Sequence, residues 1–436
     1  MKRICTLLLT AALAGSFLLA CGKEPANTNA DDPSPTAQTP SPTESTAQKY
    51  ADVVSVPATL ESYKIDPVEP LGVTVTDEMR KASVINQGNI TRIADVMVRA
   101  ANGEEITIAY LGGSITDGSS ASPQETSCYA YLTTEWWKKS FPDAKINYVN
   151  AGIGATDSYL GVHRVQKDVL DYKPDLVVVE FSVNDYKGHN KETYESLLRR
   201  ILSSETEPAV VSLFLTQENG SDFQSEHQQV AFKLQVPMVS YRNAIYPSIT
   251  DGSLAWSSVG AADGTHPNNG GHSVIAHLLT NFFRSVQDQI PTMEYKPYEM
   301  PSEKLTLCRY MNGTMYDNTN LTATALDGFE TATVSGAQFP NGWKTTTGGT
   351  ASFEVTGTNI GIVFYGTLDG KSGQFDVFID DELCATIDAN FQGQWGSYAD
   401  YRELKKFDEE GTHTIRVQPA ADTTGQQFTI LAFTVS

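Results

Sequence analysis

Short, almost wholly apolar runs alternate with helix-like segments between residues 86 and 290, and this rhythm constrains the fold more than any other feature of the chain. The apolar runs predict strands at residues 106–111, 146–149, 175–181, 209–215 and 236–239. Segments with helical periodicity lie at residues 91–101, 127–140, 158–170, 192–203, 223–234 and 271–286. Near-continuous Val and Leu runs suit parallel strands that are buried on both faces. We therefore expect an α/β domain, a three-layer α/β/α sandwich around a parallel sheet.

The rhythm changes after residue 300. Runs with strand-like alternation follow at residues 351–355, 360–365, 374–379, 383–387, 413–417 and 428–435, separated by turns rich in Gly, Asp and Thr. Asp380 and Asp381 lie between two of these runs, as the residues of a hairpin turn would. Residues 300–436 are therefore predicted to form an all-β sandwich, and residues 50–295 the α/β domain with an N-terminal extension.

The N-terminus has the layout of a signal peptide, with a Lys-Arg pair before an apolar run over residues 4–20. The run ends in Leu-Leu-Ala-Cys, which resembles the lipobox of bacterial lipoproteins. That resemblance implies removal of residues 1–20, a lipid on Cys21, and an extracytoplasmic protein anchored to a bacterial membrane. The alternative is a plain signal peptide followed by an incidental cysteine. Residues 21–49 are rich in Pro, Ser, Thr and Ala and hold no large apolar side chain, so we expect a disordered tether.

The charge balance excludes one class of partner. Acidic residues outnumber basic residues 52 to 31, which gives a formal net charge of −21. Nucleic acid attracts clustered Lys and Arg, so this balance argues against a nucleic-acid-binding protein. It also argues against adhesion of the protein body to anionic lipid, so we expect contact with the membrane through the N-terminal lipid alone. No internal stretch approaches the ~20 apolar residues of a membrane span.

The cysteines carry little chemistry. Cys5 leaves with the signal peptide and Cys21 takes the lipid. The remaining three are Cys128, Cys308 and Cys384. An odd number leaves at least one thiol free. Cys128 lies in a helical pattern and is expected to be a buried, inert thiol. A disulfide between Cys308 and Cys384 is left open.

Four polar or glycine-rich clusters are the candidate functional motifs of the α/β domain. They are Gly-Gly-Ser-Ile-Thr at residues 112–116, Asn-Ala-Gly-Ile-Gly-Ala-Thr at 150–156, Ser-Val-Asn-Asp at 182–185 and Asp-Gly-Thr-His-Pro at 263–267. Each alone has an ordinary structural explanation, because glycines form turns, Asn and Asp cap helices, and a single His is often structural. Ligands of open α/β sheets bind beyond the carboxyl ends of the strands, so this edge is where we expect the chemistry.

Together the clusters are more specific than each alone. In this order, Ser114, Gly154, Asn184 and His266 resemble the Ser-Gly-Asn-His blocks of the SGNH (GDSL-type) hydrolase superfamily. The resemblance implies a flavodoxin-like sheet and a triad in which Ser114 is the nucleophile, His266 the general base and Asp263 the group that orients the imidazole. It implies oxyanion donors from the backbone N–H of Ser114, the backbone N–H of Gly154 and the side-chain amide of Asn184. The chemistry agrees, because a serine hydroxyl needs a base near neutral pH and the base needs a third group to fix its tautomer.

Two positions depart from the superfamily pattern. Gly113 stands where the Gly-Asp-Ser-Leu motif has Asp, and Ser182 stands where a Gly usually precedes the block Asn by two places. Both changes alter the floor of the pocket and neither removes a catalytic group. The Gly-Gly-Ser-Ile-Thr form looks more like the carbohydrate-esterase branch, which removes acetyl groups from polysaccharides such as xylan. The resemblance therefore implies a serine esterase of the acetyl xylan esterase type that acts on O-acetyl esters of a poly- or oligosaccharide, with no metal or organic cofactor.

Three other functions remain open. A carbohydrate O-acyltransferase would use the same triad but pass the acyl group to a sugar hydroxyl instead of water. A catalytically inactive surface carbohydrate-binding lipoprotein is a second alternative, against which the intact Ser114, Asp263 and His266 argue. A lipase or thioesterase is the third, and its preference for acyl chain length would distinguish it.

The remaining candidate groups are the other histidines, Asp185 and the large aromatics, and His272 and His277, on the last predicted helix, are interpreted as structural or surface positions. No pair among the remaining histidines has convincing metal-ligand spacing; they are His163, His189, His227, His272, His277 and His413. Asp185 is expected either to contact substrate or to cap a helix. Of the adjacent Trp136 and Trp137, only one is expected to face the core. Packing is favoured over sugar stacking for the large aromatics of the β domain, which are Trp343, Trp395, Tyr398 and Tyr401.

Overall fold

The computed structural model describes residues 48–391, 393 and 396–436, so the predicted signal peptide, Cys21, Trp395 and nearly all of the predicted tether lie outside the described residues. The α/β domain contains a six-stranded sheet of order β1-β6-β5-β4-β2-β3. Five strands run parallel, as predicted: β2 (Glu105–Gly112), β3 (Lys145–Gly152), β4 (Leu176–Glu180), β5 (Ala209–Phe214) and β6 (Met238–Ser240). The purely parallel sheet of the prediction is corrected at one edge, where β1 (Val84–Asn86) pairs antiparallel with β6. A strand of three residues is too short to leave a period in the sequence.

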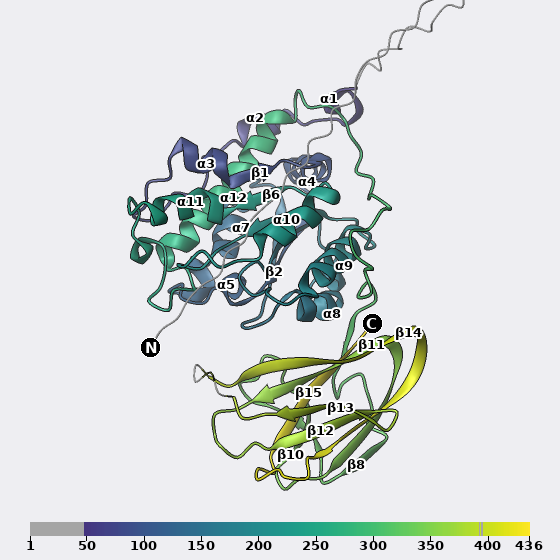
Figure 1. The fold of residues 1–436 in the computed structure, drawn as a ribbon. Helices are drawn as coiled ribbons and strands as arrows, with labels where there is room; N and C mark the ends of the chain where they lie inside the picture. The colour runs from purple at the N-terminus through teal and green to yellow at the C-terminus, as the bar shows by residue number, and fades with distance from the viewer. Residues whose placement is uncertain (1–47, 392, 394–395) are drawn as a thin grey trace, which may run out of the picture. The chain divides into compact units, whose positions relative to one another are not determined.

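Helices cover both faces of this sheet (Figure 1). The main helices of one face are α4 (Thr91–Ala101), α7 (Tyr129–Ser140) and α12 (Asn269–Gln289), joined by α3 (Asp77–Ser83) and α11 (Tyr241–Thr250). The other face carries α8 (Ser158–Asp168), α9 (Asn190–Leu202) and α10 (Gln224–Lys233). The shorter helices are α1 (Tyr50–Val53), α2 (Thr59–Ser62), α5 (Ser114–Asp117) and α6 (Gln124–Ser127), with 3₁₀ turns at Leu170–Tyr172 and Trp256–Ser258.

The alternation of contacts along β2 explains why its sequence is apolar from Ile108 to Leu111. Ile108 and Tyr110 pack into the core of the α4–α7–α12 face, whereas Ala109 and Leu111 pack into the core of the α8–α9–α10 face. A strand with helices on both sides has no solvent face, so it shows no polar alternation. The predicted three-layer α/β/α sandwich is confirmed.

The strand order determines where the loops meet. β2 lies between β3 and β4, so the chain passes over β2 when it runs from β3 to β4. The connections reverse direction at this point of a flavodoxin-like sheet, and the loops at the carboxyl ends open a crevice. The loops after β2, β3 and β4 therefore converge at one edge.

The segment that precedes α4 covers α7 and corrects one prediction. Trp136 and Trp137 are both buried, with exposed fractions of 2% and 0%, although only one was expected to face the core. The Trp136 indole N–H donates to the Asp66 carbonyl at 3.0 Å. A second helix face is thus covered by residues distant in sequence, which periodicity within α7 alone does not reveal.

A segment without regular structure follows the α/β domain and runs along α9. The Arg199 guanidinium donates to the carbonyls of Pro301 and Glu303, at 2.7 and 2.6 Å. The Glu195 carboxylate accepts the Thr306 backbone N–H at 2.8 Å. The first strand of the second domain's sheet begins after this segment, at Thr314.

The second domain is all-β and antiparallel. Its strands are β7 (Thr314–Tyr316), β8 (Ala325–Asp327), β9 (Glu330–Thr333), β10 (Asn341–Thr345), β11 (Thr350–Gly366), β12 (Gln374–Ile379), β13 (Glu382–Asp388), β14 (Tyr398–Pro419) and β15 (Phe428–Val435). The order is β13-β12-β14-β11-β15-β10-β9, with β7 on β15 and β8 on β11. The predicted all-β sandwich is confirmed. Two predicted strands, 351–355 and 360–365, are one long strand, β11.

Local features of the β domain follow the sequence closely. Asp380 and Asp381 have φ angles of 50° and 63°, the left-handed pair that a tight hairpin between β12 and β13 requires. Trp343 is buried in the core of this domain, as favoured by the sequence. All three cysteines of the described residues are free, so Cys308 and Cys384 do not pair. Cys128 is buried, as predicted.

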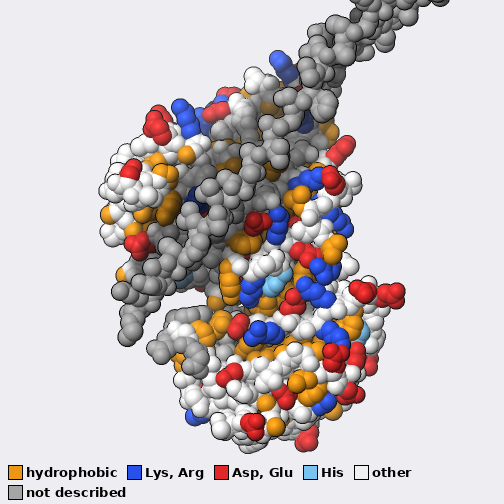
Figure 2. All heavy atoms as spheres, in the orientation of Figure 1, with side chains coloured by type: hydrophobic (Ala, Val, Ile, Leu, Met, Phe, Trp, Pro, Cys, Tyr) orange, Lys and Arg blue, Asp and Glu red, His pale blue; other side chains and the backbone are white. Residues whose placement is uncertain are grey.

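The described surface carries both signs of charge. On the face drawn in Figure 2, acidic and basic side chains are interspersed instead of gathering into separate patches. Over the described ranges, no helix is both long enough and apolar enough to cross a bilayer. Within the same residues, His, Cys, Asp and Glu nowhere form a group of three or more that could hold a metal ion.

Two of the histidines without metal-ligand spacing are buried in the neutral form. His272 accepts the Tyr129 backbone N–H on Nδ1 at 3.3 Å, and its Nε2 lies 3.2 Å from the Ser119 carbonyl, which requires the proton on Nε2. Burial lowers the pKa of His272 to about 4. His163 donates from Nδ1 to the Tyr159 carbonyl at 2.7 Å, and burial lowers its pKa to about 4 as well.

We expect His272 to destabilise the protein in acid. Above pH 6.5 the imidazole is neutral in both states. As the pH falls from 6.5 towards 4, the imidazole is protonated in the unfolded chain but stays neutral in the folded protein. This difference lowers the free energy of unfolding by about 3 kcal/mol across that pH range. Urea unfolding of wild type and His272→Gln at pH 7.5 and pH 4.5 measures this difference. The variant should lose less stability on acidification than wild type; equal losses would contradict the assignment.

Candidate functional site

The candidate site lies at the carboxyl edge of the parallel sheet. Gly113 follows β2 in an extended conformation, and Ser114 is the first residue of the short helix α5. The Asp-Gly-Thr-His cluster lies before α12 in a loop closed by the Gly260–Pro267 bridge and by the Ala261 N–H, which donates to the His266 carbonyl at 2.8 Å. Two of the four predicted clusters therefore reach the site from elements distant in sequence.

Three of the predicted residues form one hydrogen-bonded chain. Ser114 Oγ lies 2.8 Å from His266 Nε2, and His266 Nδ1 lies 2.7 Å from Asp263 Oδ2. The other Asp263 oxygen accepts the backbone N–H groups of Thr265 and His266, both at 2.9 Å. Asp263 thus fixes its own loop as well as the ring of the histidine three residues later.

This order sets the proton positions. A carboxylate accepts, so Nδ1 of His266 carries the proton and Nε2 is left to accept the Ser114 hydroxyl. Burial raises the pKa of the Asp263 carboxyl, but hydrogen bonds from the backbone and ring of His266 and from Thr265 outweigh it, and the pKa lies below its usual value. The arrangement can therefore take a proton from Ser114 while the carboxylate stabilises the resulting imidazolium.

The end of β3 is locked against the serine turn by short contacts. The Asn150 amide donates to the Thr116 carbonyl at 2.9 Å, and its oxygen accepts the Gly152 N–H at 2.9 Å. A Cβ added to Gly152 would lie 2.1 Å from the Asp117 backbone nitrogen, so only glycine allows this approach. The glycines of the second cluster thus bring the loop after β3 close to Ser114.

The two remaining predicted positions flank the serine. A Cβ built on Gly154 would lie 3.9 Å from Ser114 Cβ. A Cβ on Gly113 would lie 2.4 Å from Asn184 Oδ1, so the glycine that replaces the family aspartate makes room for the asparagine side chain. The structure therefore brings all five predicted residues, Ser114, Gly154, Asn184, Asp263 and His266, to one place.

Ser182 and Asp185, next to Asn184, are used inside the protein. Ser182 Oγ accepts the Leu215 N–H at 2.7 Å and lies 3.1 Å from Glu180 Oε1, which connects the ends of β4 and β5. Burial raises the pKa of Glu180 to about 7. Asp185 is buried, accepts the Ser158 N–H at 2.8 Å and lies 2.8 Å from His227 Nε2. Of the two roles considered for Asp185, these contacts match helix capping, at the start of α8.

Arg164 is a buried residue at the site that sequence reasoning missed. Its guanidinium donates to the Gly112 carbonyl at 2.9 Å, to the Ala151 carbonyl at 2.8 Å and to the Asp168 carboxylate at 2.9 Å. It therefore joins the last residues of β2 and β3 directly beneath the serine turn. On α8 its spacing is that of an ordinary helix arginine, and no local signal distinguishes it.

Known proteins are similar to this chain over the region that holds these residues. A model of the GDSL-like lipase/acylhydrolase family matches residues 110–274, a span that contains all four clusters. A two-domain esterase (CEX) active on acetylated mannans is similar, with a TM-score of 0.76 and 32% identity over 82% of this chain and 98% of that one. A structure of such an esterase co-crystallised with mannopentaose gives a TM-score of 0.74 and 32% identity, over 82% and 97% of the two chains. No curated protein matches the chain.

Proposed function

The chain belongs to the GDSL-like lipase/acylhydrolase family, and we propose that within it the protein is a serine esterase that removes O-acetyl groups from a polysaccharide. The observation that carries this proposal is the chain of hydrogen bonds from Ser114 through His266 to Asp263. The similarity to an esterase active on acetylated mannans supports the substrate class, and it makes an acetylated mannan a substrate to test beside the acetylated xylan suggested by the sequence.

The residues divide the reaction into two acyl-transfer steps. His266 takes the Ser114 proton as the hydroxyl oxygen attacks the acetyl carbonyl. The tetrahedral oxyanion is held by the N–H groups of Ser114 and Gly154 and by the amide of Asn184. The imidazolium then protonates the departing sugar hydroxyl, which leaves an acetyl-serine. Water, deprotonated by the same histidine, releases acetate and restores Ser114.

Acetate release tests the proposal. The chain lacking residues 1–21 is incubated with acetylated mannan, acetylated xylan and 4-nitrophenyl esters of increasing acyl length, beside Ser114→Ala. We expect acetate from at least one polymer, a preference for the acetyl ester and no turnover by Ser114→Ala. A preference for long acyl chains would favour a lipase. Acetyl transfer to an added sugar in place of acetate release would favour an acyltransferase. No turnover of any ester would favour a binding protein.

The location of the enzyme is a separate proposal. We infer that Cys21 carries a lipid and anchors the protein outside the cytoplasm, on the support of the Leu-Leu-Ala-Cys sequence that ends the apolar run. Metabolic labelling with an alkyne fatty acid in a bacterial host tests it. Label on wild type and its loss in Cys21→Ser are expected; label retained by Cys21→Ser would refute the assignment.

A further inference from the structure

A tyrosine of the β domain packs against the α/β domain. Tyr401 lies on β14, and its hydroxyl is 2.6 Å from Asp157 Oδ2 and 3.0 Å from His189 Nε2. Its ring stacks on Tyr159, with centroids 4.4 Å apart and planes 8° apart. The Lys187 ammonium lies 3.6 Å from the centre of the same ring. The Tyr401 side chain thus contacts the α/β domain both through its hydroxyl and through its ring.

These contacts belong to the two loops that carry the remote oxyanion donors. Asp157 caps α8 at the end of the loop that follows β3, three residues after Gly154. Lys187 and His189 lie in the loop between β4 and α9, three and five residues after Asn184. The described hydrogen bonds of Tyr401 therefore connect the Gly154 loop to the Asn184 loop from outside the α/β domain.

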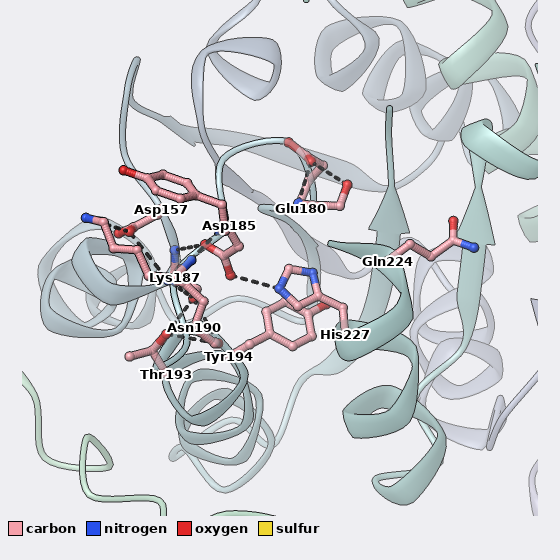
Figure 3. Close-up of polar contacts among 12 residues, drawn as sticks. Asp157, Glu180, Asp185, Lys187, Asn190, Thr193, Tyr194, Gln224 and His227 are labelled. Carbon is pink, nitrogen blue, oxygen red and sulfur yellow. Dashed lines mark hydrogen bonds and ion pairs between the residues drawn. The ribbon is translucent and has the colours of Figure 1, made fainter. Parts of the chain in front are cut away.

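The two loops also form one buried polar cluster with each other (Figure 3). Five labelled residues lie together in this view: Asp157 before α8, Asp185 and Lys187 between β4 and α9, Asn190 at the start of α9, and His227 on α10. The Asn190 side-chain oxygen accepts the backbone N–H of Lys187 at 2.7 Å. The Asp185 carboxylate accepts the Ser158 N–H at 2.8 Å and the Asn190 amide donates to Asp157 Oδ2 at 3.4 Å, so a shift of one loop is transmitted to the other.

The direction of the hydrogen bonds at Tyr401 is fixed by burial and charge. Burial and the neighbouring Asp157 carboxylate raise the pKa of the Tyr401 phenol, so the hydroxyl keeps its proton and donates it to Asp157. Burial lowers the pKa of His189, and its neutral ring can donate from Nε2 to the phenol oxygen. Lys187, 3.9 Å from Asp157 Oδ2, supplies the balancing positive charge. Each group has a defined role, and removal of the hydroxyl leaves a buried carboxylate without its shortest donor.

We propose that Tyr401 is a positioning residue through which the β domain holds the Gly154 and Asn184 loops at the spacing that the oxyanion requires. The inference rests on the proposed function. Donors stabilise a tetrahedral intermediate only when they are held in place before the reaction, and a displacement of about 1 Å is enough to lower the rate strongly. The β domain is then part of the catalytic unit even for an ester too small to touch it.

A residue of the same junction provides the matched control. Tyr310 is also buried and packs edge-on against Tyr159, with centroids 5.7 Å apart, but its hydroxyl bonds to Glu403 on β14 and to neither loop. Loss of either hydroxyl weakens the contact between the domains, whereas only loss of the Tyr401 hydroxyl removes the hydrogen bonds that hold both loops to the β domain.

The test compares Tyr401→Phe and Tyr310→Phe in the full-length chain with 4-nitrophenyl acetate. We expect kcat to fall about tenfold in Tyr401→Phe, with KM unchanged, and to stay within about twofold of wild type in Tyr310→Phe. Phenylboronic acid, which forms a tetrahedral adduct with the serine, should bind more weakly to Tyr401→Phe by a similar factor. A purely structural role would lower the melting temperature of both variants without this change in kcat and in boronate affinity.

A second variant keeps the test decisive if Tyr401→Phe folds poorly. Asp157→Ser retains a helix-capping oxygen on a side chain too short to reach the Tyr401 hydroxyl. It should reproduce the loss in kcat, and the double variant should lose no more than either single one. Full kcat in both single variants, or an equal loss in Tyr310→Phe, would refute the inference alone. A wild type inactive on every ester would refute the proposed function, and the inference with it.

Discussion

Replacing His266 with alanine is expected to lower kcat for 4-nitrophenyl acetate about 10⁴-fold or more, with little change in KM. Without the imidazole, neither the Ser114 hydroxyl nor the water that later attacks the acetyl-serine has an acceptor for its proton. Because the two side chains act as one unit, the Ser114→Ala/His266→Ala double variant should be no slower than either single variant. Initial rates at several substrate concentrations measure both constants.

The chain contains a matched control for this substitution. His413 in the β domain also bonds its Nδ1 to an aspartate, Asp380, at the 2.7 Å that separates His266 Nδ1 from Asp263. His413→Ala removes a similar dyad with no serine beside it and should leave kcat unchanged. Retention of more than about a tenth of wild-type kcat by His266→Ala would contradict its role as the general base.

Asp263→Asn separates orientation from charge in the same chain of bonds. An asparagine amide facing His266 Nδ1 would donate to it, which leaves the proton on Nε2 and removes the acceptor for the Ser114 hydroxyl. We therefore expect a loss in kcat of about 10³–10⁴-fold although the geometry is almost unchanged. The predictions for Asp263→Asn and His266→Ala are linked, because both depend on the His266 tautomer that the Asp263 carboxylate selects.

The candidate site was predicted through the resemblance of four short motifs to the SGNH hydrolases, and these motifs can be recognised because each is local. An Asp-x-x-His loop in which Asp263 accepts the N–H groups of Thr265 and His266 is determined by four residues, and a Gly-Gly-Ser turn by three. The parallel sheet then brings these turns to a common edge, since all five strands point the same way. Short-range turns and strand periodicity are the features that a sequence records directly.

Features formed by contacts between distant segments could not be predicted in the same way. Trp136 is buried because the segment before α4 covers it, and Arg199 holds the segment that follows the α/β domain. Tyr401 was interpreted as a core or loop-anchoring aromatic, which its burial supports, but nothing in the strand pattern indicated that the residue contacting it would be Asp157. The partner of a side chain is a property of the fold, whereas its tendency to be buried is a property of the residue.

Arg164 belongs to this second class, and its removal is expected to affect stability and catalysis together. In Arg164→Met the side chain keeps its apolar stem but leaves the Ala151 carbonyl and the Asp168 carboxylate without their guanidinium donor. The Asp168 side chain is 25% exposed and stays solvated, so the main cost is the buried carbonyl left without a donor, and the free energy of unfolding in urea should fall by about 1–3 kcal/mol. Because the guanidinium also joins the ends of β2 and β3, kcat should fall even at temperatures where the variant is fully folded.

A second arginine separates these two effects. Arg200 on α9 donates to backbone carbonyls in the same manner, to Val162 at 3.1 Å and to Gly313, but it contacts neither β2 nor β3. Arg200→Met should lower the free energy of unfolding and leave kcat of the folded protein near the wild-type value. If both variants lost activity equally at matched fractions folded, the contribution of Arg164 would be to stability alone. A selective loss in Arg164→Met would instead mean that the Ser114 turn depends on the spacing of the two strand ends, because the guanidinium is the described side chain that bonds both the Gly112 and the Ala151 carbonyl.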